Sequence, residues 1–410
     1  MAGSTLRIAV RNLGRSPKRT ALTLTAIAVA QVGLLSMDGL VNGYVDGIVS
    51  AITGPMIGDV QVHHPMWREE RALEQTVGGI SAALEAIRAT PGVEQASARI
   101  YAPSLTAAKE DAHIALVVGV DPELEATGVG LLATVPKAEL PTEGRVLVGR
   151  KLADKMGIGA GAELALIGQA ADGSIANDLY IVSGLLHTTV DEVNRSGVVM
   201  TTADAQALFA LHDQAHEIVV KGSNVVTPEQ LSRALGALPL LGGTEILAWR
   251  ALVPDLAKII ELSKMSSYII LVLVFVAAAA GIANTMLMAT FERTRELGML
   301  LALGCEPLRI VRMLTVEAVM LGALGVALGS VIGWALVAVT AHTGLDMSAL
   351  AGGEMDFAFQ GLVLPMKVTP RLECFDVAIG VAAVLFTSLL AAVWPAIHAA
   401  RLQPMEAMRA

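Results

Sequence analysis

Long uncharged stretches alternate with charged segments along this chain. Four stretches, at 20–37, 268–290, 318–341 and 377–397, contain no Asp, Glu, Lys or Arg. A helix needs about 20 apolar residues to cross a hydrocarbon core of ~30 Å. The last three stretches, with 23, 24 and 21 residues, reach this length. The first has 18, which is enough if Arg19 and Asp38 lie at the two interfaces. The pattern predicts one membrane span, a large domain outside the bilayer and three further spans.

The predicted fold class is therefore an α-helical membrane protein with four spans (1+3) and a large α+β domain outside the bilayer. The bounds are an N-terminal segment 1–19, spans at 20–44, 267–290, 313–341 and 376–397, an exterior domain 45–266, loops 291–312 and 342–375, and a tail 398–410. A cleaved signal peptide is the alternative for the first span, because Ala28-Val29-Ala30 is typical of a cleavage site. The apolar run continues to Leu35, which favours an anchor.

The distribution of basic residues predicts the orientation. Residues 1–19 carry five Lys or Arg and no acid, and residues 292–312 carry four Arg against three Glu. Short loops rich in Lys and Arg stay in the cytoplasm, so both termini and this loop are expected there. Residues 41–266 hold 16 basic and 27 acidic residues and are expected outside. The net charge of −9 argues against nucleic acid as a partner.

Two similar strand, helix, strand units are predicted in the exterior domain. Their elements are strands at 58–64, 93–107 and 112–120 with a helix at 81–89, and strands at 217–221 and 244–248 with a helix at 228–238. Short apolar runs at 145–149, 163–167 and 180–186 predict a β-rich inserted lobe over 122–194. Residues 249–266 have helical spacing and would lead into the second span as a stalk.

No catalytic motif is present in the sequence. The dipeptide Gly-Lys does not occur, which excludes a P-loop, and Gly-x-Ser-x-Gly, His-Glu-x-x-His and Cys-x-x-Cys are missing as well. His212 and His216 could share a helix face as metal ligands, but no third ligand is evident, so solvated surface histidines are favoured. The same holds for His63 and His64. We therefore expect a protein that is no enzyme and binds no metal or cofactor of its own.

The loop after the second span carries the most informative pattern. Charged residues come first, then apolar residues, then a glycine that can end a helix. These residues are Glu292, Arg293, Arg295, Glu296, Leu297, Gly298, Leu300, Leu301, Leu303 and Gly304. The pattern predicts a short amphipathic helix. It could dock into a groove on another protein, or it could rest on the lipid interface, and the residues favour neither.

This Glu-Arg-Thr-Arg-Glu-Leu-Gly segment resembles the coupling helix of FtsX-like ABC transporter permeases of the MacB and LolC/LolE type. The opening Arg11-Asn12-Leu13, the closing Pro395-Ala396 segment and the 1+3 layout resemble that family as well. The resemblance implies a dimer with a second permease subunit, in the bacterial inner membrane. It also implies two cytoplasmic ATPase subunits that hold ATP and Mg²⁺ and move the periplasmic domains by mechanotransmission.

The end of the first span suggests a substrate class. Met37-Asp38-Gly39-Leu40 is similar to a Met-Asn-Gly-Phe segment of LolC-type permeases, where lipoprotein acyl chains are taken up. Lipoprotein extraction is thus the leading hypothesis, with a periplasmic chaperone or adaptor as a further partner. MacB-like efflux of peptides or amphiphiles and FtsX-like regulation of a periplasmic hydrolase are the alternatives. The candidate lipid contacts are Met37, Leu40, Val41, Ile48, Phe357, Phe359, Leu362 and Met366.

Small residues follow one face of the third span. Gly322, Gly325, Gly329 and Gly333 are spaced so that helix backbones can approach closely, either within the chain or across a dimer. Gln31 and Asn284 are isolated polar residues in the first two spans, and the simplest role for each is a hydrogen bond to a neighbouring helix.

Overall fold

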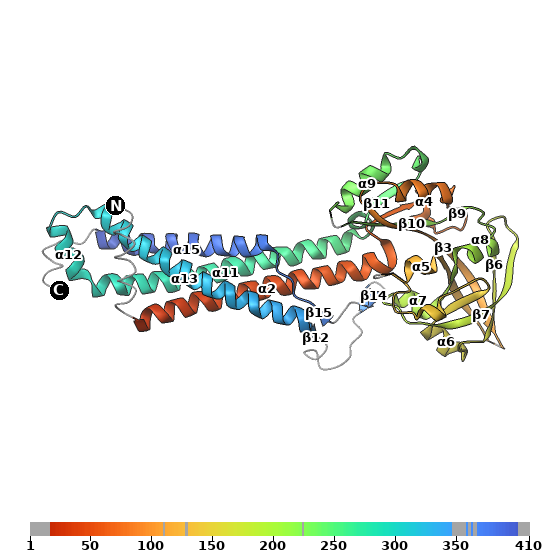
Figure 1. Ribbon diagram of the computed structural model, residues 1–410, viewed down its shortest axis with the longest axis horizontal. Helices are drawn as coiled ribbons and strands as arrows, with labels where there is room; N and C mark the ends of the chain where they lie inside the picture. The colour runs from red at the N-terminus through yellow and green to blue at the C-terminus, as the bar shows by residue number, and fades with distance from the viewer. Residues whose placement is uncertain are drawn as a thin grey trace. The chain divides into compact units, whose positions relative to one another are not determined.

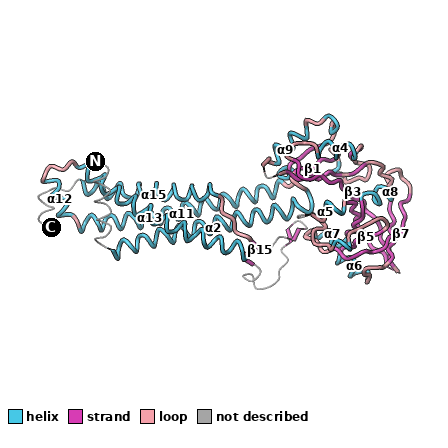
Figure 2. Tube along the Cα trace, viewed as in Figure 1, coloured by secondary structure: helices cyan, strands magenta, loops and turns pink. Residues whose placement is uncertain are grey.

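The computed structural model describes residues 17–109, 111–127, 130–223, 225–346, 358–359, 362–363 and 367–400. The chain forms two compact units. The helical unit contains Met1–Val45, Ile259–Met347 and Lys367–Ala410, and the strand-rich unit contains Asp46–Lys258 and Ser348–Met366. Figure 2 shows this division in its colours: the first unit is mostly helix, and the second contains the long strands together with short helices and loops.

Four long helices make up most of the helical unit, where they lie side by side (Figure 1). They are α2 (Pro17–Ile52), α11 (Pro254–Glu292), α13 (Pro307–Thr343) and α15 (Cys374–Ala400). All four are long and apolar enough to cross a bilayer. At 36 and 39 residues, α2 and α11 are much longer than a span requires, and both continue into the strand-rich unit.

The glycines of α13 lie where this helix meets two neighbours. A methyl group added at Gly325 would lie 2.7 Å from the Ile27 side chain, and one at Gly329 would lie 2.6 Å from Gln31. Gly333 faces Leu35 in the same way, and Gly322 faces Ser388 of α15. Side chains of ordinary size would not fit at these distances. The close packing therefore occurs within the chain, between α13 and the helices α2 and α15.

Nine strands of the strand-rich unit form one sheet, in the order β11-β1-β10-β3-β4-β8-β5-β7-β6. Their bounds are β1 Val60–His63, β3 Val93–Ala108, β4 Asp111–Val120, β5 Arg145–Gly149, β6 Glu163–Gln169, β7 Ile175–Leu186, β8 Gly197–Thr201, β10 Glu217–Gly222 and β11 Glu245–Ala248. A further pairing of β3 with β6 closes six of these strands into a ring. Two short strands, β2 (Val77–Gly78) and β9 (Gln214–Ala215), pair separately.

Strand β3 belongs to both parts of this sheet. Its first half pairs with β10, and its second half pairs with β4 and β6. Short helices cover the sheet: α3 Trp67–Glu70, α4 Ile80–Arg88, α5 Pro122–Glu125, α6 Arg150–Met156, α7 Asp191–Ser196, α8 Thr202–Leu208, α9 Pro228–Gly236 and α10 Trp249–Leu252. One buried apolar core runs through the unit, from Val60 on β1 to Leu166 on β6.

The predicted elements of the two strand, helix, strand units are confirmed within two residues. The bounds of the inserted lobe, however, are wrong. The closed part of the sheet also contains the second half of β3 and the whole of β4 and β8. It therefore begins before residue 122 and ends after residue 194, the two predicted bounds. A sixteen-residue strand that serves two partners in turn cannot be divided by local sequence pattern.

The stalk before the second span is also shorter than predicted. Helix α10 ends at Leu252, Val253 leaves the helical conformation, and α11 begins at Pro254. The proline ring disfavours helical geometry at the preceding residue, which accounts for the break. At the other junction, a π-helical turn, Thr53–Ile57, follows α2.

The strand-rich unit holds this turn by a buried cation. Arg99 of β3 donates to the carbonyl oxygens of Pro55 at 2.9 Å and Met56 at 2.5 Å. Both oxygens of Glu125 accept from the same guanidinium, at 2.8 and 2.9 Å. The Arg99 guanidinium thus donates to four oxygen atoms, and a buried charge requires such partners. The sequence analysis missed this pair, because Arg99 lies in an otherwise apolar strand whose partner is 26 residues away.

Candidate functional site

The short helix predicted after the second span is present. Helix α11 ends at Glu292, Arg293 is non-helical with φ −107° and ψ 14°, and α12 runs over Thr294–Ala302. Gly304 follows with φ +85°, a conformation that favours glycine, and α13 begins at Pro307. The chain thus bends twice and leaves α12 between two long helices (Figure 1).

The apolar residues of α12 divide into two sets. Leu297 is buried, and it packs in a cluster with Ile310 and Leu314 of α13. Leu301 is half-buried against the same cluster, and Gly298 is buried. The pattern grouped Leu297 with Leu300, Leu301 and Leu303 on one apolar face, whereas the structure buries Leu297 against α13. Helical spacing alone identified the apolar residues but could not show which neighbour they contact.

Other apolar side chains at this end of the bundle are open. Met299 is 46% exposed, Leu300 39% and Leu303 85%. Leu308, in the first turn of α13, is 72% exposed and was not predicted. These four residues, which we call the docking patch, stand beside the exposed charged residues Glu292 and Arg295, while Glu296 is half-buried. An exposed apolar patch with a charged rim is typical of a protein interaction site.

A buried ion pair fixes the bend before α12. Arg293 donates to both carboxylate oxygens of Glu317 on α13, at 3.2 and 3.4 Å, and both side chains are about nine-tenths buried or more. The sequence analysis placed Arg293 at an interface and missed Glu317. That glutamate comes immediately before the uncharged stretch of the third span, and this position was its only signal. The pair and Leu297 together attach α12 to α13.

Polar residues within the bundle bond mainly to neighbouring helices. Gln31 of α2 donates to the Ser330 hydroxyl of α13 at 3.3 Å, which confirms the simplest role predicted for it. The hydroxyl groups of Thr23 and Thr285 lie 2.8 Å apart and link α2 to α11. Asn284 is exposed on α11 instead.

The end of the bundle that contains Asn42 is more polar than the sequence suggested. Asn42 of α2 donates to Asp376 of α15 at 2.8 Å. Beside this bond lies a cavity of about 90 Å³, whose lining includes Asp38, Lys264 and Glu373. Val41, a candidate lipid contact, also lines this cavity.

The remaining candidate lipid contacts lie in different environments. Met37 is 38% exposed and Leu40 is half-buried, whereas Ile48 is buried. Phe359 and Leu362 belong to the short strands β13 (Ala358–Phe359) and β14 (Leu362–Val363). Phe357 and Met366 lie outside the described residues, as do Arg11-Asn12-Leu13 and the tail from residue 401.

The two histidines that were weighed together as metal ligands lie in different environments. His212 is exposed in a turn, but His216 is fully buried, so the two share no helix face. The Nδ1 atom of His216 accepts from the Tyr101 backbone N–H at 3.0 Å, which leaves Nε2 to donate to the Leu73 carbonyl. Burial lowers the pKa of His216 to about 4, and the ring is neutral at pH 7.

His63 is fully buried as well, so the expectation of a solvated surface histidine was wrong for both His63 and His216. All four residues of β1 are buried, since this strand pairs on both edges and is covered on both faces. Strand alternation could predict opposite directions for His63 and His64, but it could not show that the second face is covered.

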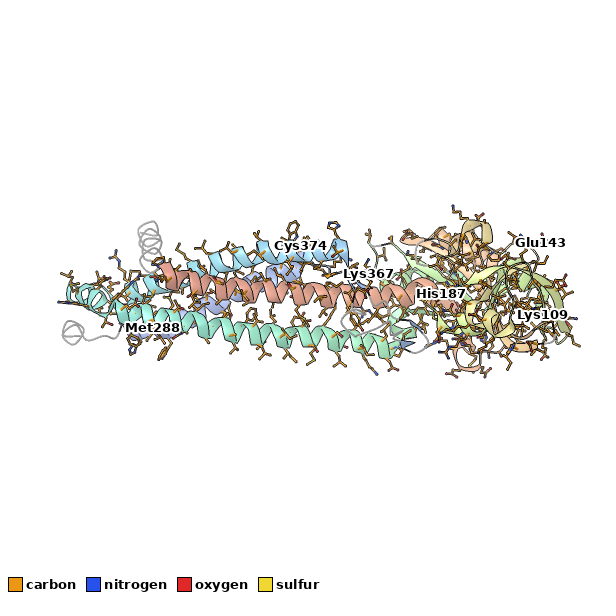
Figure 3. The ribbon with its side chains drawn as sticks, turned by 90° about the horizontal axis from the view of Figure 1, so that it is seen from below. Lys109, Glu143, His187, Met288, Lys367 and Cys374 are labelled. Atoms are coloured by element: carbon orange, nitrogen blue, oxygen red, sulfur yellow. The ribbon has the colours of Figure 1, made fainter. Side chains whose placement is uncertain are left out.

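These features define a class of protein. It is a multi-pass membrane protein with a large mixed domain after its first long helix and a short, firmly held helix between its second and third. Side chains labelled in Figure 3 mark the two units, with Lys109 and Glu143 on the strand-rich unit and Met288 and Cys374 on the long helices.

Comparison with known families identifies the class. Residues 20–238 match the model of the MacB-like periplasmic core domain, and residues 268–404 match that of the FtsX-like permease C-terminal domain. The chain belongs to the family of FtsX-like permeases with a MacB-like periplasmic core. The resemblance seen in the coupling and C-terminal segments is thereby confirmed.

Individual relatives point in two directions. The chain is 25% identical to the lipoprotein-releasing system transmembrane protein LolC of Neisseria meningitidis, over 66% of each chain. It is 36% identical to the macrolide export ATP-binding/permease protein MacB of Shewanella oneidensis, over 34% of this chain and 18% of MacB. The chain thus spans just under two thirds of the LolC relative. It also aligns with the periplasmic region of MacB from Actinobacillus actinomycetemcomitans, at 12% identity and a TM-score of 0.35, over 49% of this chain and 94% of that one.

Proposed function

We propose that this chain is the membrane subunit of an ABC transporter and that separate cytoplasmic ATPase subunits drive it. The observation that carries this proposal is the docking patch: Met299, Leu300, Leu303 and Leu308 are exposed around a helix that Leu297 and Arg293 hold in place. A docking helix must be packed rigidly against its own chain if a movement of the ATPase subunit is to be transmitted to the spans. An interfacial helix that only rests on lipid needs no buried ion pair to position it.

ATP and Mg²⁺ would be held by the partner. The chain contains no P-loop sequence, and the proposal assigns nucleotide binding to a separate protein in contact with it. The coupling route runs from α12 to α13 and then, through the glycine contacts at Gly325 and Gly329, to α2. Since α2 continues toward the strand-rich unit, movement of α12 would be transmitted to that domain as a mechanical signal.

A second permease subunit is part of the proposal. Among the four long helices of the described chain, α11 is the least buried. Met265, Ile269, Val272 and Val276 lie exposed along α11 at helical spacing. Such a stripe suits a helix of a partner subunit, and the proposal leaves open whether that subunit is a second copy.

We favour lipoproteins as the substrate, and the process as their extraction from the outer leaflet of the inner membrane. The LolC relatives align over most of this chain, whereas MacB aligns over about a third of it. The higher identity of the MacB match keeps efflux of amphiphiles as the second candidate. Mass spectrometry of material that copurifies with the tagged chain from native membranes separates the two: triacylated lipoprotein supports the first, and a periplasmic adaptor supports the second.

The coupling role is tested by charging the docking patch. We expect Leu300→Asp together with Leu303→Asp to abolish copurification of the ATPase subunits and to reduce ATP hydrolysis by the tagged complex at least tenfold, because two carboxylates would be desolvated at the contact. The matched control is Leu240→Asp, which changes an exposed leucine of the strand-rich unit. Unchanged copurification and turnover in the double variant would refute the docking role.

A further inference from the structure

The strand-rich unit contains a cavity of about 560 Å³ that the coupling role leaves unused. Its apolar walls come from Met56, Ile57, Pro103, Leu116, Leu252 and Val253. Arg68 and Arg71 lie among these walls, and Glu192 stands at the exposed rim. The volume falls within the usual range of small-molecule sites, about 300–1,000 Å³, which combine apolar walls with a few placed polar groups.

A buried network lies beneath Arg71. The carboxylate of Glu217 on β10 is buried, and it accepts from Trp67 Nε1 at 2.7 Å and from Gln61 Nε2 at 3.0 Å. Arg71 Nη1 donates to the same carboxylate at 3.2 Å. The His216 ring stacks on the Trp67 ring, with 4.3 Å between the two ring centroids. Four residues from three segments therefore cooperate to hold one guanidinium.

Arg71 is held in a specific orientation. Its φ is +52°, in the left-handed region that a residue with a Cβ rarely adopts. Its guanidinium carbon lies 5.0 Å from the centre of the Trp67 ring, and its side chain is 59% exposed. Within the part of the chain that the structure describes, no residue accepts a hydrogen bond from the other guanidinium N–H groups of Arg71. The fold thus fixes a cation at the cavity and leaves hydrogen-bond donors available there.

We propose that this cavity binds an amphiphile with a carboxylate or phosphate head group. The head group accepts from the unused N–H groups of Arg71, whose planar fork matches two oxygens of either anion. Arg68, held by its bond to the Leu252 carbonyl at 3.1 Å, adds a second positive charge nearby. The hydrocarbon part lies against Met56, Ile57 and Leu116. Glu192 at the rim disfavours ligands with a second, distant negative charge.

The position of the cavity couples its occupancy to both chain junctions of the unit. Ile57 ends the turn that follows α2, and Val253 is the last residue before α11. A ligand in contact with both would restrain the two segments through which this unit connects to the long helices. Binding of a ligand would therefore change the freedom of the segments that lead to the spans. This adds a binding function to the proposed mechanical one.

Photolabelling of the full chain in detergent micelles tests this site without ATP or a partner subunit, so its outcome is independent of the proposed function. The probes are diazirine derivatives of dodecanoate, of dodecyl phosphate and of dodecyltrimethylammonium, with labelled peptides mapped by mass spectrometry. We expect both anionic probes to label the peptides that contain Met56 and Leu252, and the cationic probe to label neither. Labelling by only one anionic probe would assign the natural head group, a fatty acid carboxylate or a lipid phosphate.

Arg71→Gln should reduce labelling by the anionic probes about tenfold, since a charge-assisted hydrogen bond is lost. Arg250→Gln is the matched control. Arg250 also stacks on a tryptophan, at 4.7 Å, and pairs with a glutamate, but it does not line the cavity. Should Arg71→Gln unfold, Arg71→Lys keeps the charge without the fork and should weaken labelling by a smaller factor. Equal labelling by cationic and anionic probes, or equal effects of the two glutamine variants, would overturn the proposal.

Discussion

At the scale of single residues, a buried charge holds one bend of the chain in place in each unit. Arg99 fixes the turn after α2 in the strand-rich unit, and Arg293 fixes the bend before α12 in the helical unit. Each cation is paired with a buried glutamate rather than with solvent. Because a buried charge without its partner is expensive, each pair selects one local geometry strongly even where its net contribution to stability is small.

The pair at the bend yields a prediction on charge exchange. We expect Arg293→Glu or Glu317→Arg alone to lower the stability of the purified chain by about 3–5 kcal/mol, because each leaves two like charges buried together. The double exchange should recover a large part of that loss. Thermal unfolding in detergent, with copurification of the ATPase as a second readout, measures both effects.

Arg295 provides the control for this exchange. It lies two residues away and is exposed, so Arg295→Glu should change stability by less than about 0.5 kcal/mol. If the double exchange is no more stable than either single variant, the ion pair does not orient α12 in the way we infer.

At the scale of elements, close contact between α13 and α2 depends on residues without side chains. The helices approach so closely at Gly325 and Gly329 that α2 side chains occupy the space where a Cβ would lie. Attraction between helices in a bilayer comes from such packing rather than from the hydrophobic effect. The interface is therefore sensitive to the addition of single methyl groups.

Alanine substitutions measure this sensitivity. Gly329→Ala should destabilise the chain by about 1–3 kcal/mol, since the new methyl group would lie 2.6 Å from the Gln31 Cβ. Gly281→Ala is the matched control, because Gly281 lies in α11 with no neighbouring atom within 4 Å of the new group. The control should be neutral or slightly stabilising, as alanine is the better helix former. Equal melting temperatures for both variants would show that the glycine contact is not tight.

At the scale of the whole molecule, the proposed mechanism needs the docking patch and the strand-rich unit on opposite sides of the membrane. The excess of basic residues in the loop that contains α12, and of acidic residues in the large domain, favours this arrangement. The proposed arrangement has α11 as the single span between the large domain and α12, and a single span carries the chain from one side of the membrane to the other.

Cysteine accessibility tests the arrangement directly. With Cys305 and Cys374 replaced by serine, single cysteines are placed at the exposed positions Glu163 and Arg295. In intact spheroplasts, a membrane-impermeant maleimide should label Glu163→Cys, and Arg295→Cys should be labelled only after the membrane is opened. Labelling of both in intact spheroplasts would refute the topology and, with it, the proposed function.

Local pattern was enough to determine most elements of this protein. The four long helices follow from length and apolarity, the strands of the core domain from runs such as residues 93–107, and the bend of α12 from charged residues followed by Gly304. Each of these signals depends on residues a few positions apart, whose period of 2 or 3.6 can be read directly from the chain. The family could be recognised for the same reason, because its coupling segment is contiguous.

Only the tertiary structure decided which face of each element is covered and by what. Leu297 turns inward because Ile310 and Leu314 lie beside it, and His216 is buried because Trp67 stacks on its ring. Strand β3 serves two parts of the sheet because β10 and β6 approach it from distant points of the chain. The partners of Arg71, Arg99 and Arg293 were hidden for the same reason. Contacts between residues far apart in sequence leave no period in it, so both the ion pairs and the cavity at Arg71 appear only once the chain is folded.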